Sequence, residues 1–152
     1  MNVLDKTTSH CPDKALTNVV SREAMEENGW EFHISHWDKT KFADICGTDT
    51  WYGFYNGDAF GSISANFNGR GFGILQFGNC WAHKEVSVYL NGNKIGYALG
   101  NVKRKEIQFH FEPVDKLKVA EDGAIIKLHS LSITCYRKYT LVAIVTILRY
   151  TF

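Results

Sequence analysis

The chain has 152 residues, of which 14% are aromatic and 22% are charged, and its formal net charge is +1. This length suits a single domain with its own hydrophobic core. The 17 basic and 16 acidic side chains nearly cancel, which argues against a nucleic-acid-binding protein, because phosphate contacts need a basic face. The basic cluster Lys103–Lys105 is typical of a solvated turn.

The first 28 residues contain one helix candidate, at residues 13–27. Leu16, Val19, Val20 and Ala24 follow helical spacing, and the following Asn-Gly pair supplies a stop. A loop or a first strand through residues 16–20 is the alternative. We therefore predict an N-terminal segment, residues 1–28, with a short helix.

From Trp30 onward the pattern changes to strands with apolar side chains at every second position. Gly and Asn turns separate them at intervals of about 10 residues, as in sandwiches and barrels. The predicted strands are 30–34, 50–56, 60–67, 71–78, 85–90, 94–99, 106–112, 116–121 and 124–135. We predict an all-β, antiparallel β-sandwich of about eight or nine strands over residues 29–135.

Local signals predict two turns and one irregularity in these strands. Asn91-Gly92 is typical of a two-residue hairpin turn, because both residues tolerate a positive φ angle. Asn68-Gly69 predicts a second tight turn. In the last strand, Ile126 and Leu128 alternate in one phase and Leu131 and Ile133 in the other. This slip predicts a β-bulge around residues 129–130.

The C-terminal tail, residues 136–152, contains an apolar run from Leu141 to Leu148. A membrane helix needs about 20 such residues, so we expect no membrane span. The tail is one more strand, a segment outside the domain, or the start of a truncated anchor.

The four cysteines, Cys11, Cys46, Cys80 and Cys135, are dispersed and include no C-x-x-C pair. An even number of dispersed cysteines predicts two disulfides in an oxidising compartment, with three connectivities open. Four free thiols in a cytosolic protein are the alternative. We expect an extracellular or secreted protein, although residues 1–14 lack the apolar region of a signal peptide.

Aromatic and polar side chains are mixed in the segments 49–62 and 66–70. This mixture suits a carbohydrate, because the C–H face of a sugar ring stacks on an aromatic ring while polar groups bind the hydroxyls. The predicted platform is Trp51, Tyr52, Tyr55 and Trp81, and the predicted polar groups are Asn56, Asp58, Asn68, Arg70 and His83. The alternative is that strand aromatics fill the core and Asn-Gly-Asp is turn chemistry.

The Cys80-Trp81 pair just before the hairpin has two interpretations. The favoured one is a disulfide sulfur packed against a buried indole, as in many sandwiches. The other is an exposed indole that stacks on a sugar.

Motifs for catalysis and metal binding are absent from the sequence. There is no G-x-S-x-G, no glycine-rich phosphate loop and no H-E-x-x-H. His33 and His36 would point to opposite faces of a strand. The glutamates Glu85, Glu106, Glu112 and Glu121 are expected to be exposed on strands. We expect no cofactor and no enzyme; calcium bound by Asp49, Asp58 or Asp122 is the minor alternative.

The run Gly71–Cys135 resembles the galactose-binding-like jelly-roll superfamily. The shared features are a strand ending in Gly-Asn-Cys-Trp, a V-x-V-Y-L-N-G hairpin and a D-x-L-x-V-x-E-x-G-A-I-I-x-L segment. The resemblance implies an eight-stranded sandwich that binds sugars or other cell-surface ligands through loops at one end, sometimes with structural calcium. A non-catalytic glycan-binding module is therefore the leading hypothesis. The alternatives are a structural or protein-interaction ectodomain and a small polysaccharide hydrolase or lyase.

Overall fold

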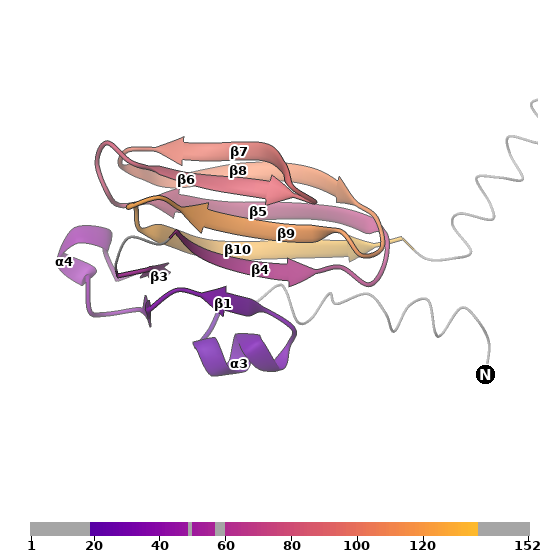
Figure 1. The fold of residues 1–152 in the computed structure, drawn as a ribbon, viewed down its shortest axis with the longest axis horizontal. Coiled ribbons are helices and arrows are strands. Elements are labelled where there is room, and N and C mark those ends of the chain that lie inside the picture. Colours follow the sequence, from indigo (N-terminus) through magenta and orange to yellow (C-terminus); the bar gives the residue numbers. More distant parts are fainter. Residues whose placement is uncertain (1–18, 49, 57–59, 137–152) are drawn as a thin grey trace, which may run out of the picture.

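Two five-stranded antiparallel sheets pack face to face in the computed structural model, which describes residues 19–48, 50–56 and 60–136 (Figure 1). The first sheet has the order β1 (Glu31–His33), β4 (Gly61–Asn66), β9 (Lys116–Glu121), β6 (Glu85–Leu90) and β7 (Asn93–Leu99). The second has the order β2 (His36–Asp38), β3 (Trp51–Phe54), β10 (Ile126–Cys135), β5 (Gly71–Asn79) and β8 (Val102–Phe111).

The order of the strands defines a jelly roll. Without the short edge strands β1 and β2, the two sheets read β4-β9-β6-β7 and β3-β10-β5-β8. The chain crosses between the sheets at almost every connection, and the β6–β7 hairpin stays within one sheet. Four strands in each of two sheets, connected in this way, form a double Greek key. The predicted jelly-roll β-sandwich is therefore confirmed. The structure adds β2, a strand that the sequence did not predict.

The core lies between the sheets and follows the predicted alternation. Ile63 and Ala65 of β4 and Leu117 and Val119 of β9 are buried, while most of their strand neighbours on the outer face are polar. The same phase holds on β5, where Leu75 is fully buried. Alternation of this kind removes one face of each sheet from water, and this burial is the main favourable term in folding.

The hairpin and the bulge are confirmed. Asn91 and Gly92 have φ angles of 51° and 83°, as a two-residue turn requires. The register of β10 against β5 shifts between Leu128 and Ser130. Asn68-Gly69 also lies at a bend, but it joins β4 to β5, which belong to different sheets. It is therefore a crossover between layers.

The N-terminal helix, α3 (Arg22–Glu27), is shorter than predicted, and residues 13–18 lie outside the described part of the chain. The Ser21 hydroxyl accepts a hydrogen bond from the Ala24 amide and caps the helix. Met25 and the following Trp30 are almost completely buried in the main core. The helix therefore closes one side of the sandwich, beneath β1 in Figure 1.

The sequence did not predict α4 (Ala43–Cys46). Before it, the carboxylate of Asp38 accepts hydrogen bonds from the amides of Thr40 and Lys41, which lower the pKa of Asp38. A helix of four residues has too few positions to show a helical period. Tyr52 and the Cys46–Cys80 disulfide lie in a second buried cluster together with Ile125.

The expectation of exposed strand glutamates is wrong for Glu121, which is 2% exposed. Its carboxylate accepts hydrogen bonds from the amides of Tyr55, Gly61 and Gly123 at 3.1, 2.8 and 2.7 Å. The amides of Tyr55 and Gly123 belong to the β3–β4 and β9–β10 connections, and Gly61 is the first residue of β4. Glu121 therefore ties two loops together at one end of the sandwich.

Several predictions fall partly or wholly outside the described residues. These concern the N-terminal segment up to residue 18 with Cys11, the tail from residue 137 onward, Asp49 and Asp58. Over the described part of the chain, the helices are too short to cross a bilayer.

Replacement of Glu121 by alanine should lower the free energy of unfolding by about 2–4 kcal/mol, because buried amides would lose a charged acceptor. Urea denaturation measures this change. Glu112→Ala is the control and should cost at most about 1 kcal/mol, since the Glu112 side chain is exposed and forms a surface ion pair with Arg70. Equal losses in the two variants would show that Glu121 does not hold the loops.

Candidate functional site

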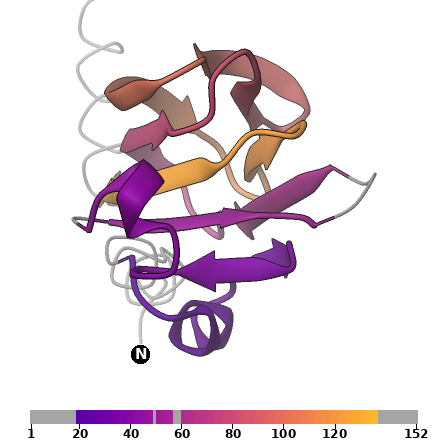
Figure 2. The ribbon, with the colours of Figure 1, turned by 90° about the vertical axis from the view of Figure 1, so that its left-hand side faces the viewer.

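One end of the jelly roll gathers most of its long connections. The pairings Gly61↔Glu121, Glu85↔Leu99 and Ile126↔Asn79 place the β3–β4, β5–β6, β7–β8 and β9–β10 loops together. Helix α4 lies at the same end, on the left of Figure 1, and Figure 2 turns this end toward the viewer. Loops held at one end of a rigid sandwich are a frequent location for ligand sites.

Two pockets open at this end. The larger, the Trp81 pocket, has a volume of about 820 Å³ and is lined by Ile45, Cys46, Gly47, Asn79, Cys80, Trp81, Ala82, His83, Asn101, Val102, Lys103 and Lys127. The smaller, the apolar pocket, has a volume of about 310 Å³ and is lined by Phe42, Ile45, Phe54, Tyr55, Trp81, Glu121, Gly123, Ala124 and Ile125. Trp81 and Ile45 line both, so the two pockets are neighbours.

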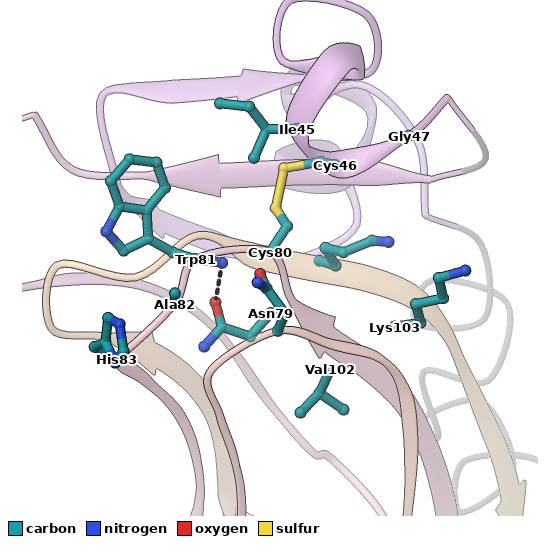
Figure 3. A pocket seen from close by; sticks show the side chains of 12 residues that line it. Ile45, Cys46, Gly47, Asn79, Cys80, Trp81, Ala82, His83, Val102 and Lys103 are labelled. Atoms are coloured by element: carbon teal, nitrogen blue, oxygen red, sulfur yellow. Dashed lines mark hydrogen bonds between the residues drawn. A yellow bond between two sulfur atoms is a disulfide. The ribbon is translucent and has the colours of Figure 1, made fainter.

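Asn79 determines the path of the loop that carries Trp81. Its side chain is 1% exposed and donates hydrogen bonds to the carbonyls of Lys84 and Ala98 at 2.8 and 3.1 Å. Its carbonyl oxygen accepts from the Trp81 amide at 2.9 Å (Figure 3). All the hydrogen-bonding groups of this buried amide are therefore used to position backbone.

The disulfide supplies the second anchor. Cys46 of α4 is bonded to Cys80, with a Cα–Cα distance of 5.2 Å. Cys135 is disulfide-bonded as well, and none of the three described cysteines is free. The prediction of disulfides is thus confirmed for Cys46 and Cys80. The bond holds Trp81 and the α4 residue Ile45 on the same side of the pocket in Figure 3.

Trp81 does not pack into the core, as the favoured interpretation of the Cys80-Trp81 pair expected. Its relative exposure is 44%, whereas Cys80 beside it is 7% exposed. The reason is the turn at Asn79, after which the chain leaves β5 and no longer alternates between core and solvent. The indole therefore presents an apolar surface to solvent between the two pockets.

The larger pocket also holds a buried lysine. Lys127 is 6% exposed, because α4 and the disulfide cover this end of the second sheet. Lys103 lies across the pocket from Trp81 in Figure 3 and is exposed. Of the described residues, neither an aspartate nor a glutamate lines this pocket.

The predicted ligand residues divide between the two ends of the molecule. Tyr55 and His83 line the pockets beside Trp81, and Asn56 follows Tyr55 in the same loop. Asn68 and Arg70 lie in the β4–β5 connection at the opposite end, where Arg70 pairs with Glu112. The single site expected from sequence therefore cannot include these two.

The two predicted platform residues of β3, Trp51 and Tyr52, do not line either pocket. Tyr52 is fully buried; burial raises its pKa, while its hydroxyl accepts a hydrogen bond from the Phe42 amide. It offers no ring face to a ligand. Trp51 is half-buried and stacks on Trp37 with 5.8 Å between ring centroids. Trp51 therefore packs against the edge strand β2, away from Trp81.

Sequence reasoning missed most residues of the pocket wall, among them Ile45, Asn79, Asn101, Lys103 and Lys127. Lys127 falls between Ile126 and Leu128, so the alternation assigns it to the outer face, where a lysine is ordinary. Its burial depends on α4, which the sequence did not predict. Among the described residues, no cluster of three or more His, Cys, Asp or Glu side chains could hold a metal ion; Asp49 and Asp58 lie outside them.

No known family model matches the chain, and no curated protein matches it. Solved structures similar to it include the carbohydrate-binding module CBM36 in complex with calcium and xylotriose, at 13% identity over 68% of this chain and 92% of that one, with a TM-score of 0.40. CBM35 from Paenibacillus barcinonensis matches at 14% identity over 71% and 94%, also with a TM-score of 0.40. TmCBM61 in complex with β-1,4-galactotriose matches at 11% identity over 70% and 88%, with a TM-score of 0.44.

The TM-scores lie below 0.5, and the fold assignment of this chain rests on its own strand order.

Replacement of Asn79 by alanine should lower the free energy of unfolding by about 1–3 kcal/mol, because buried backbone groups would lose their partners. It should also increase the accessibility of Trp81 to acrylamide quenching. Asn101→Ala is the matched control, because Asn101 lines the same pocket but is exposed. If the two variants behave alike, Asn79 does not position Trp81.

Removal of the disulfide by Cys46→Ala with Cys80→Ala should lower the free energy of unfolding by about 3–4 kcal/mol, since it closes a loop of 34 residues in the unfolded chain. Thermal and urea unfolding measure the change. A loss below about 1 kcal/mol would mean that the packing around Tyr52 holds α4 without the bond.

Proposed function

We propose that this domain is a non-catalytic extracellular binding module whose ligand is a glycan, bound at the end that carries Trp81. The observation that carries the proposal is the exposed indole of Trp81, which stands between two pockets and is held by a disulfide and a buried amide. An exposed apolar ring held in this way is suited to stacking on a sugar ring.

The polar groups around Trp81 complete such a site. His83 and Asn101 line the larger pocket and can exchange hydrogen bonds with hydroxyl groups. Because the disulfide and Asn79 order the loop before a ligand arrives, little conformational entropy is lost on binding. Disulfides persist in oxidising compartments, which supports an extracellular location.

The carboxylates at this end support a binding role over catalysis. A general acid of a glycosidase needs a raised pKa. Lys94 and Ser87 instead bind the Glu85 carboxylate and lower its pKa. Glu121 is occupied by three backbone amides. Both groups therefore serve structure in the pocket that they share on the outer face of the first sheet.

The test is a screen of the purified protein against an array of neutral and acidic glycans, followed by calorimetry on the best ligand. Trp81→Ala should weaken binding at least tenfold, a loss of about 1.4 kcal/mol, because the stacking surface is removed. Its melting temperature should stay close to that of the wild type, since Trp81 is exposed.

Tyr97→Ala is the matched control, because Tyr97 is 48% exposed on β7 and lines neither pocket. It should bind like the wild type. Failure to bind any glycan would overturn the proposed function in favour of a structural or protein-interaction ectodomain. Binding that survives Trp81→Ala but not Tyr97→Ala would move the site to the outer face of the first sheet.

A further inference from the structure

Lys127 is a lysine with a buried stem in the wall of the Trp81 pocket. Its neighbours in the strand, Ile126 and Leu128, belong to the core, so its own side chain emerges on the outer face of the second sheet. In the sheet register, Lys127 lies opposite Tyr52 of β3 and Gly78 of β5. Because α4 and the disulfide cover this part of the sheet, 94% of the residue is removed from solvent, as its 6% exposure shows.

The ammonium group of Lys127 has no partner among the described residues. None of their ion pairs or side-chain hydrogen bonds includes it. The stem of Lys127 is buried, but the ammonium nitrogen itself is not, because no buried side-chain nitrogen or oxygen of the described residues lacks a hydrogen-bond partner. The unpaired ammonium group therefore reaches the water of a pocket of about 820 Å³.

The remainder of the pocket wall has the same sign of charge. Lys103 contributes a second ammonium group, and no acidic side chain among the described residues lines the pocket. Like charges in a pocket wall without a carboxylate beside them produce a positive potential, which concentrates anions. The net charge of +1 for the whole chain shows that this potential is local.

We infer that the Trp81 pocket binds the anionic group of an acidic glycan, a carboxylate or a sulfate, and that this group pairs with Lys127. Lys103 lies at the same pocket and adds to the attraction. The inference rests on the proposed function and names its ligand class. A hydroxyl of a neutral sugar can accept a hydrogen bond from an ammonium group, but an anion forms a stronger, charge-assisted hydrogen bond with it.

The experiment compares Lys127→Met with the wild type. Methionine retains an apolar stem without the charge, so the melting temperature without ligand should stay the same or rise. Lys118→Met is the matched control, because Lys118 of β9 is exposed and lies over Tyr89 on the other sheet. A large fall in melting temperature in Lys127→Met alone would overturn the inference, because the lysine would then have a structural role.

Three probes separate the possible ligands: oligogalacturonate, its methyl ester, and a sulfated oligosaccharide, each titrated by calorimetry. The wild type should bind at least one charged probe at least about tenfold more tightly than the methyl ester, and Lys127→Met should remove that preference. The charged probe that is preferred identifies carboxylate or sulfate as the partner. Added salt should weaken only the binding of the charged probes.

Inorganic sulfate, followed through the fluorescence of Trp81, distinguishes failure of the inference from failure of the proposed function. Saturable sulfate binding that depends on Lys127, without binding to any glycan, would retain the anion site and reject the glycan. Equal binding of neutral and acidic glycans, unaffected by Lys127→Met, would retain the proposed function and overturn the inference.

Discussion

The Cys46–Cys80 disulfide is the constraint on which the candidate site depends. It fixes α4, a helix of four residues that could not persist alone, because helix nucleation is unfavourable in so short a segment. Once α4 is held there, it covers Tyr52 and Ile125, closes a second apolar cluster and forms one wall of two pockets. The jelly roll supplies a rigid end of the sandwich, and the disulfide holds α4 there so that the two pockets form.

Covering one end of a sheet also changes the character of the residues beneath. An outward-facing position on an ordinary strand is solvated, and a lysine there has no special role. At Lys127 the same position is enclosed on one side and open to a pocket on the other. The consequence is an ammonium group that its buried stem holds at the pocket without a counter-charge, which suits it to pair with an anion.

The alternation of apolar residues was enough to predict the sandwich, the hairpin at Asn91-Gly92 and the bulge before Ser130. These features depend on neighbours in sequence and on a period of two. The location of Asn68 and Arg70 at the far end could not be predicted, because it depends on which sheet receives each strand. The burial of Glu121 is likewise a property of two loops that meet only in the folded chain.

The same reasoning explains why Trp81, and not the aromatic segment around Tyr52, marks the candidate site. Composition alone favours 49–62, where aromatic side chains are dense, but density on a strand is also what a core requires. Trp81 follows Asn79, a buried residue whose side-chain amide makes three hydrogen bonds to the backbone. Trp81 therefore lies beyond the end of β5, where side chains no longer alternate between core and solvent. Its exposure therefore has no explanation in packing, and a ring held at the surface by buried interactions is better evidence for a site than aromatic density.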